Sequence, residues 1–150
     1  MKKTLTLLIC LICYQILCHA QVADEHYYFK NLSVQNGLSQ NTVNTILQDK
    51  QGFMWFGTKD GLNRYDGLSF RKFKHDDRSQ RSIGNNFITA LYEDEKGSIW
   101  VGTDVGLYIY YPEKDSFEHF TKQSVENTRI EHTVTALAGD NQGGVWLAVE

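Results

Sequence analysis

Apolar and polar positions alternate along short stretches of the chain, and these stretches recur. Residues 53–58 place Met54 and Phe56 on one face of a predicted strand and Trp55 and Gly57 on the other. Two later copies keep this order, with Ile99, Trp100, Val101 and Gly102, and then with Val145, Trp146, Leu147 and Ala148. Both faces are apolar or small, whereas a sheet with one face in water would show a polar face. We therefore expect this strand to be covered on both sides, with each small residue leaving room for a neighbouring sheet.

The preceding stretch, residues 39–49, fits two patterns. Val43, Ile46 and Leu47 have helical spacing behind a possible N-cap at Ser39. Val43, Thr45 and Leu47, in contrast, lie at alternate positions, as in a strand. The aligned later stretches are only eight residues long, which suits a buried strand better than a helix. They are residues 87–94 and 133–140. We predict a strand in all three copies.

Turn residues separate the strands that follow. The pairs Asp60-Gly61 and Asp66-Gly67 mark tight turns. A strand is predicted at residues 62–65 and an exposed outer strand of mixed polarity at residues 69–73, with counterparts at 107–111 and 115–120. The aromatic cluster at residues 26–32 predicts a further outer strand. The links at 74–86 and 121–132 are polar and lack apolar periodicity, so they are predicted surface loops, where binding groups commonly lie.

The copies recur at the period of a propeller blade. Trp55 and Trp100 are 45 residues apart, and Trp100 and Trp146 are 46 apart. The predicted fold class is all-β, with four-stranded antiparallel β-propeller blades: two complete blades and part of a third, an incomplete propeller. The predicted organisation is a signal peptide at 1–20, an N-terminal segment at 21–36, blades at 37–73 and 74–120, and a partial blade at 121–150.

The first twenty residues predict export. Lys2 and Lys3 precede an apolar run at residues 5–17, and small residues lead to a cleavage site after Ala20. A membrane anchor is the alternative, although the run is short of the roughly 20 residues that cross a bilayer. All three cysteines lie in this segment, so the mature chain offers no thiol chemistry. The mature chain would hold 13 basic and 18 acidic residues, a formal charge of −5 that argues against nucleic acid as a partner.

The combined pattern resembles a known family. It runs Asn36-Gly37-Leu38-Ser39-Gln40-Asn41-Thr42-Val43 and then Asp49-x-x-Gly52-x-Met54-Trp55-Phe56-Gly57-Thr58-x-x-Gly61-Leu62-x-x-Tyr65-Asp66. This is similar to the two-component regulator propeller repeat. The third copy departs from the pattern, with Trp146-Leu147-Ala148-Val149 in place of Trp-x-Gly-Thr.

That resemblance implies a function as well as a fold. Such repeats form the periplasmic sensor region of hybrid sensor histidine kinases of Bacteroidota, which typically sense glycans. The resemblance therefore implies periplasmic localisation, an oligosaccharide or sugar ligand, and a longer parent. In such a parent, further blades, an inner-membrane anchor, a kinase and a dimeric receptor are expected.

The repeated residues are interpreted as scaffold. They are Asp49, Gly52, Trp55, Gly57, Thr58, Gly61, Asp94, Gly97, Trp100, Gly102, Thr103, Gly106, Asp140, Gly143 and Trp146. The three Asp residues could form a carboxylate ring that binds a metal, but one turn-capping Asp per blade explains them better. The Trp residues could stack on sugar rings, although packing between blades is the favoured reading. His26, His75, His119 and His132 lack zinc spacing, so no metal, cofactor or catalytic residue is predicted.

The candidate ligand-binding residues lie in the first link. They are His75, Asp76, Asp77, Arg78 and Arg81, a set of hydrogen-bonding groups suited to a polar or anionic saccharide. A solvated charged loop is the alternative.

The function expected is a non-enzymatic, ligand-sensing propeller module of a two-component receptor. The alternatives are a fragment of a secreted propeller enzyme acting on glycans, either a lyase or a glycosidase, and a truncated remnant without independent function. Since a repeat buries its faces only against its neighbours, residues 21–150 alone are expected to aggregate or fold loosely.

Overall fold

A computed structural model describes residues 27–122, 128–140 and 142–150. The chain divides into two units, Met1–Asn31 and Leu32–Glu150. In the first unit only residues 27–31 are described, and they form no regular secondary structure. The strand predicted at residues 26–32 is therefore wrong over residues 27–32, because its aromatic side chains Tyr27, Tyr28 and Phe29 stay exposed rather than packing on a sheet.

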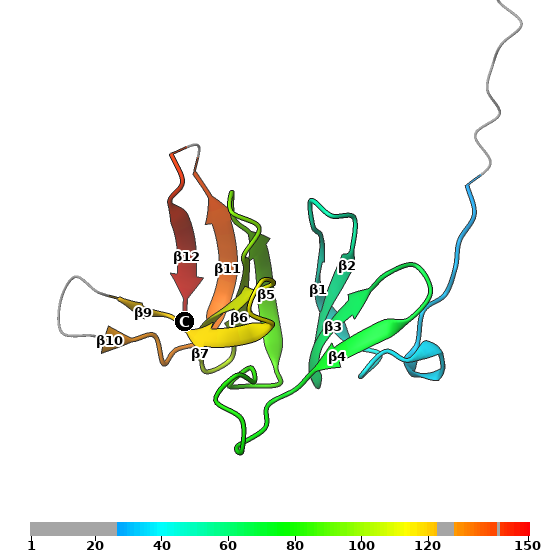
Figure 1. Ribbon diagram of the computed structural model, residues 1–150, viewed down its shortest axis with the longest axis horizontal. Helices are drawn as coiled ribbons and strands as arrows, with labels where there is room; N and C mark the ends of the chain where they lie inside the picture. The colour runs from blue at the N-terminus through cyan, green and yellow to red at the C-terminus, as the bar shows by residue number, and fades with distance from the viewer. Residues whose placement is uncertain (1–26, 123–127, 141) are drawn as a thin grey trace, which may run out of the picture. The chain divides into compact units, whose positions relative to one another are not determined.

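The second unit contains two four-stranded antiparallel sheets, each a simple meander (Figure 1). Blade 1 consists of β1 (Val43–Gln48), β2 (Met54–Thr58), β3 (Gly61–Tyr65) and β4 (Phe70–Phe73). Blade 2 consists of β5 (Ile88–Glu93), β6 (Ile99–Thr103), β7 (Gly106–Tyr111) and β8 (Ser116–His119). A third sheet holds only β11 (Val134–Gly139) and β12 (Val145–Val149). The predicted fold class, two blades and part of a third, is confirmed.

The ambiguity at residues 39–49 is resolved in favour of a strand, since β1 pairs with β2 along its length. The three first strands share an irregularity that the alternation does not reveal. The register shifts between Val43 and Thr45, between Ile88 and Ala90, and between Val134 and Ala136. A bulge at one place in each copy shows that the repeat extends to backbone detail.

Two further segments differ from the sequence-based expectation. A short 3₁₀ helix, η1 (Val34–Asn36), precedes blade 1 and is capped by Ser33 and by Gly37 at φ 108°. The second link, predicted as a loop, contains the paired strands β9 (Thr121–Lys122) and β10 (Thr128–Arg129).

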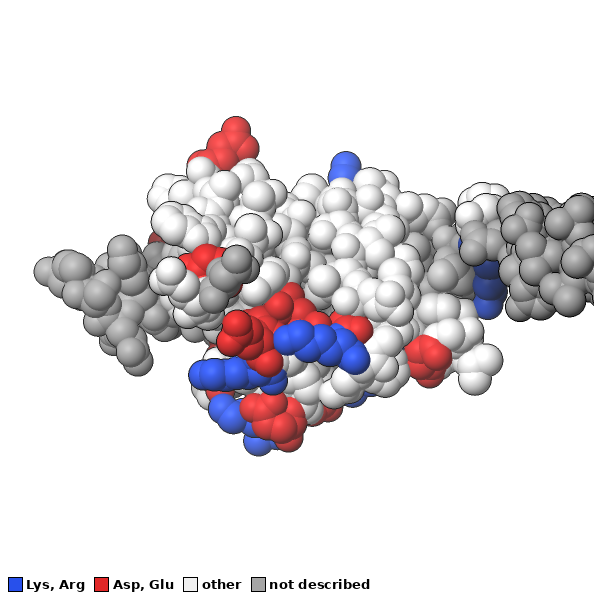
Figure 2. Space-filling view, turned by 90° about the horizontal axis from the view of Figure 1, so that it is seen from above, with Lys and Arg blue, Asp and Glu red and all other residues white. Residues whose placement is uncertain are grey.

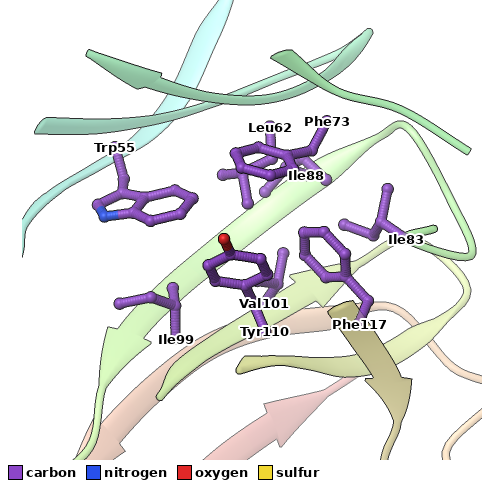
Figure 3. Close-up of a cluster of buried hydrophobic side chains, with 9 residues drawn as sticks. All are labelled: Trp55, Leu62, Phe73, Ile83, Ile88, Ile99, Val101, Tyr110 and Phe117. Atoms are coloured by element: carbon purple, nitrogen blue, oxygen red, sulfur yellow. The ribbon is translucent and has the colours of Figure 1, made fainter. Parts of the chain in front are cut away.

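The core lies between blade 1 and blade 2 (Figure 3). Trp55 is 1% exposed and stacks on Phe73, with ring centroids 5.6 Å apart, while Tyr110 tilts against both rings from blade 2. Phe117 and Phe73 meet edge to face at 5.5 Å. The outer strands predicted to be exposed therefore each bury one aromatic side chain, because an edge strand can turn one face inward while its other face stays in water.

Small residues allow the blades to approach closely. A methyl group built on Gly57 would lie 2.6 Å from Ile88 Cγ2, and one built on Gly102 would lie 2.9 Å from Val134 Cγ1. Both neighbours belong to the first strand of the following blade. The prediction that the small residue two positions after each Trp leaves room for the next sheet is confirmed at these two junctions.

Candidate functional site

The predicted ligand residues lie in the link from β4 to β5, at the lower end of the blades in Figure 1. His75 is held by three contacts within this link. Its backbone N–H donates to Asn86 Oδ1 at 2.7 Å, its Nδ1 lies 3.0 Å from the carbonyl oxygen of Ile83, and its Nε2 lies 2.8 Å from Asp77 Oδ1. The Asp77 carboxylate, and next the Ile83 carbonyl, raise the pKa of His75 because both stabilise the imidazolium.

Asp76 and Arg78 form a second pair. Asp76 Oδ1 accepts from the backbone N–H of Arg78 at 3.0 Å and from its Nε at 3.2 Å. The backbone bond, followed by the side-chain bond, lowers the pKa of Asp76. Ser82 closes the turn by accepting from Asp76 N at 3.1 Å. Arg81 enters the fold through its backbone, whose carbonyl accepts from Phe117 N at 3.0 Å. The structure thus groups four of the five predicted residues into two pairs, with Arg81 serving as a backbone anchor.

The link also contributes a core residue that its polar composition conceals. Ile83 is fully buried within the core cluster and lies beside Phe117 (Figure 3). Gly84 follows it, and a methyl group built there would overlap the Tyr108 hydroxyl. The link is therefore packed into the junction between the blades, while the side chains of Asp77 and Arg78 remain 94% and 91% exposed.

The repeated aspartates cap turns, as predicted, and the first two also bind the repeated tryptophans. Asp49 Oδ1 accepts from the backbone N–H of Gln51 at 3.0 Å and of Phe53 at 2.9 Å, while Oδ2 accepts from Trp55 Nε1 at 2.7 Å. Asp94 repeats all three bonds, with Trp100 Nε1 at 3.0 Å. Asp140 repeats the two backbone bonds, at 2.8 and 2.7 Å. The hydrogen bond from Trp to Asp was not predicted from the sequence, although the constant six-residue spacing between these two residues is a signal for it.

The repeated Thr and Gly residues brace the second turn of blade 1 and of blade 2. Thr58 Oγ1 donates to the carbonyl of Gly61 at 2.9 Å, and Thr103 Oγ1 donates to that of Gly106 at 3.0 Å. Gly61 has a φ of 117° and Gly106 a φ of 126°, values that disfavour any other residue. These positions therefore shape turns.

A charged contact that the sequence does not reveal joins the two blades. Arg71 Nη2 of β4 lies 2.7 and 2.6 Å from the two carboxylate oxygens of Asp115, which sits in the β7–β8 turn at φ 48°. Tyr110 Oη donates to Asp115 Oδ1 at 2.9 Å. The Arg71 bond, and next the Tyr110 bond, lower the pKa of Asp115, while burial and then Asp115 raise the pKa of Tyr110 to about 12. We call Arg71, Tyr110 and Asp115 the interblade latch.

The described ranges offer neither a metal cluster nor a membrane helix. No group of three His, Cys, Asp or Glu side chains in them is placed to hold a metal ion, and none of their helices is long and apolar enough to cross a bilayer. The predicted signal peptide, its cleavage site at Ala20, the three cysteines and His26 lie outside the described residues.

The chain is similar to known proteins over most of its described length. A family model described as "Two component regulator propeller" matches residues 37–60 and 82–105. A curated histidine kinase of Formosa agariphila is 40% identical over 60 residues, which are 40% of this chain and 4% of that protein.

Solved structures show the same fold. The extracellular domain of the hybrid two-component system BT3049 of B. thetaiotaomicron is 34% identical, with a TM-score of 0.71 over 81% of this chain and 18% of that one. The corresponding domain of BT4673 from the same organism is 22% identical, with a TM-score of 0.63 over 83% of this chain and 18% of that one, and it supports the fold alone. The chain thus spans less than a fifth of the length of each of these relatives.

Proposed function

We propose that this chain forms part of the ligand-sensing propeller of an exported two-component receptor, because the family model of the two-component regulator propeller matches two of its repeats. One observation carries this proposal. The chain matches the extracellular domain of a hybrid two-component system at 34% identity over 81% of its length. The proposal includes export to the periplasm, a membrane-anchored parent with further blades and a histidine kinase, and a dimeric receptor.

The proposed ligand is a carbohydrate. A propeller is a rigid scaffold whose turns and links present side chains at its two ends, and such surfaces suit an extended, hydroxyl-rich ligand. The charged side chains on the β4–β5 link, Asp77 and Arg78 above all, are exposed enough to reach one. Within the described residues, the repeated Asp and Thr side chains form hydrogen bonds in turns. We therefore assign to the scaffold a role in presenting a binding surface and not in catalysis.

Ligand-induced stabilisation tests the proposal. The full-length receptor proposed above, called the intact protein from here on, is purified with its membrane anchor. It is heated in the presence of a panel of neutral and acidic oligosaccharides. A ligand that binds only the folded state raises the unfolding midpoint, and above Kd the stabilisation grows with the logarithm of the ligand concentration. At least one oligosaccharide should raise the midpoint without changing in chain length during incubation. Shortening of the oligosaccharide would instead support a glycan-cleaving enzyme, and a panel without any effect would contradict carbohydrate sensing.

A further inference from the structure

We propose that a hollow between blade 1 and blade 2 binds the carboxylate of an acidic sugar residue. This inference rests on the proposed carbohydrate-sensing function and names the site and the ligand class. The hollow lies at the end of the blades opposite the β4–β5 link, beside the β1–β2 and β5–β6 turns (Figure 1). Residues of the β7–β8 turn also line it. It has a volume of about 410 Å³ and is lined by Gln51, Arg64, Lys96, Gly97, Pro112 and Glu113.

Arg64 differs in chemical type from its counterpart in blade 2. It lies opposite Trp55 in the pairing of β2 with β3, on the face toward blade 2, and its counterpart opposite Trp100 is Ile109. Ile109 is only 8% exposed, so packing at this position is satisfied by an apolar side chain. Phe53, which supports Arg64, is likewise replaced in blade 2, by Ser98. Blade 1 alone therefore places a cation where the scaffold requires none.

The guanidinium of Arg64 is held in place by aromatic rings. It lies 4.5 Å from the centre of the Phe53 ring and 5.7 Å from that of Trp55. Contacts with ring faces fix the side chain while leaving its N–H donors available for an anion. Because the forked donors of arginine match the two oxygens of a carboxylate, this orientation is suited to that group.

Blade 2 supplies a second cation on the facing wall. Lys96 is exposed on the β5–β6 turn, and its counterpart in blade 1 is Gln51, which lines the same hollow. The two turns are tied together, since Lys50 donates from its backbone N–H to Glu93 Oε2 at 2.9 Å and from Nζ to the carbonyl of Asp94 at 2.8 Å. The walls that carry Arg64 and Lys96 are thus held at a fixed separation.

The remaining lining suits a sugar rather than a bare anion. Gln51 can donate and accept, and Glu113 accepts, so both can bind the hydroxyl groups of a ring whose carboxylate meets the two cations. The lining carries one more positive than negative side chain. A volume of about 410 Å³ falls in the ordinary range for small-ligand sites. Figure 2 looks onto this end of the blades, and there acidic and basic side chains gather in one patch while most of the visible face is uncharged.

The repeat itself provides the variants for a test. Arg64→Ile copies blade 2 at Ile109, and Lys96→Gln copies blade 1 at Gln51, so each introduces a residue that the same scaffold already accepts. Lys72→Gln is the control, because it removes an equal charge from the opposite face of blade 1, where Lys72 pairs with Asn63. Binding is measured by isothermal titration calorimetry on the intact protein, with a galacturonate trisaccharide as probe. Its methyl ester and sodium acetate are the comparison ligands.

The trisaccharide should bind the wild type and the Lys72→Gln variant equally. Because a hydrogen bond to a charged group is commonly worth a factor of about ten or more in affinity, Arg64→Ile and Lys96→Gln should each weaken binding by at least about tenfold. The methyl ester should bind as weakly as the acid binds the variants, and acetate should not displace the trisaccharide at equal concentration.

Several results would overturn the inference: no binding of the acid, equal binding of the ester, unchanged affinity in both hollow variants, or displacement by acetate, which would indicate a small-anion site. These failures are separable from failure of the proposed function. If neutral oligosaccharides stabilise the protein while the hollow variants behave as wild type, carbohydrate sensing stands and this site is wrong.

Discussion

Asp49→Asn is expected to destabilise blade 1 through the indole of Trp55 and not through the turn. Asp49 Oδ1 accepts the backbone N–H groups of Gln51 and Phe53, and the Oδ1 of an asparagine can accept them as well. The second carboxylate oxygen accepts Trp55 Nε1 at 2.7 Å. In asparagine an NH₂ group occupies that place, so a donor would face a donor.

The magnitude follows from the burial of Trp55. Its side chain is 1% exposed, so water cannot replace the lost acceptor. A hydrogen bond to a charged group contributes about 1.5–3 kcal/mol, and Asp49→Asn should therefore lower the local free energy of unfolding by roughly 2 kcal/mol. Trp55→Phe removes the donor, and in that background Asp49→Asn should cost less than about 1 kcal/mol. The difference between the two costs is the coupling energy of this bond.

Hydrogen–deuterium exchange on the intact protein measures these costs, because it reports the local opening free energy of the β1 and β2 amides. Asp94→Asn is the matched replicate, because Asp94 makes the same three bonds in blade 2, with Trp100 Nε1 at 3.0 Å. It should speed exchange in β5 and β6 in the same way. Equal costs of Asp49→Asn with Trp and with Phe at position 55 would refute the reasoning.

Four further outcomes are expected. Gly57→Ala should destabilise the junction of the blades by roughly 1–3 kcal/mol, seen as faster exchange in β5, because the new methyl group would lie 2.6 Å from Ile88 Cγ2; unchanged exchange would contradict this. The bond from Arg71 lowers the pKa of Asp115, so the interblade latch contributes fully above pH 3.8 and is lost as the pH falls through the folded-state pKa below 3.8; an acid titration of tryptophan fluorescence should show this loosening, and Asp115→Asn should abolish it. The pKa of His75 is raised by Asp77, so its contribution is complete below pH 6.5 and is lost as the pH rises through the folded-state pKa; an NMR titration of the ring should shift toward 6.5 in Asp77→Asn, and an unshifted titration would exclude the pair. Residues 21–150 expressed alone should aggregate or unfold without cooperativity, because Trp146 and Val149 are 70% and 51% exposed; a monomer with a cooperative thermal transition would contradict this.

Strand positions and blade packing were predictable because they depend on local alternation and on a repeat that can be compared with itself. The alternation around Trp55 placed the strand, and the small residue at position 57 predicted a neighbour that the structure supplies in Ile88. Asp49 could be assigned to a turn from the sequence because turn capping is local, and its side chain bonds to residues only two and four positions ahead. Such interactions leave a signature within a few residues of sequence.

The charged contact between the blades and the core residue of the β4–β5 link left no such signature. Arg71 and Asp115 are 44 residues apart, and neither belongs to the shared pattern. Ile83 is a single apolar residue in a polar link, so periodicity could not identify it as core. The predicted ligand residues were chosen for their charge density, but His75 and Asp76 direct much of their hydrogen bonding toward their own link. Charge density in a sequence does not distinguish a binding loop from one that folds onto itself.

The junction of two blades is the smallest unit at which this scaffold can join stability to ligand binding. Gly57 and Ile88 bring the blades together, the interblade latch holds their outer edges, and the proposed carboxylate site takes Arg64 from one blade and Lys96 from the other. A ligand that contacts both walls binds only when the blades are packed, so its binding free energy adds to the stability of the junction. Loosening that junction with Gly57→Ala should, by the same linkage, weaken ligand binding without altering any residue of the hollow.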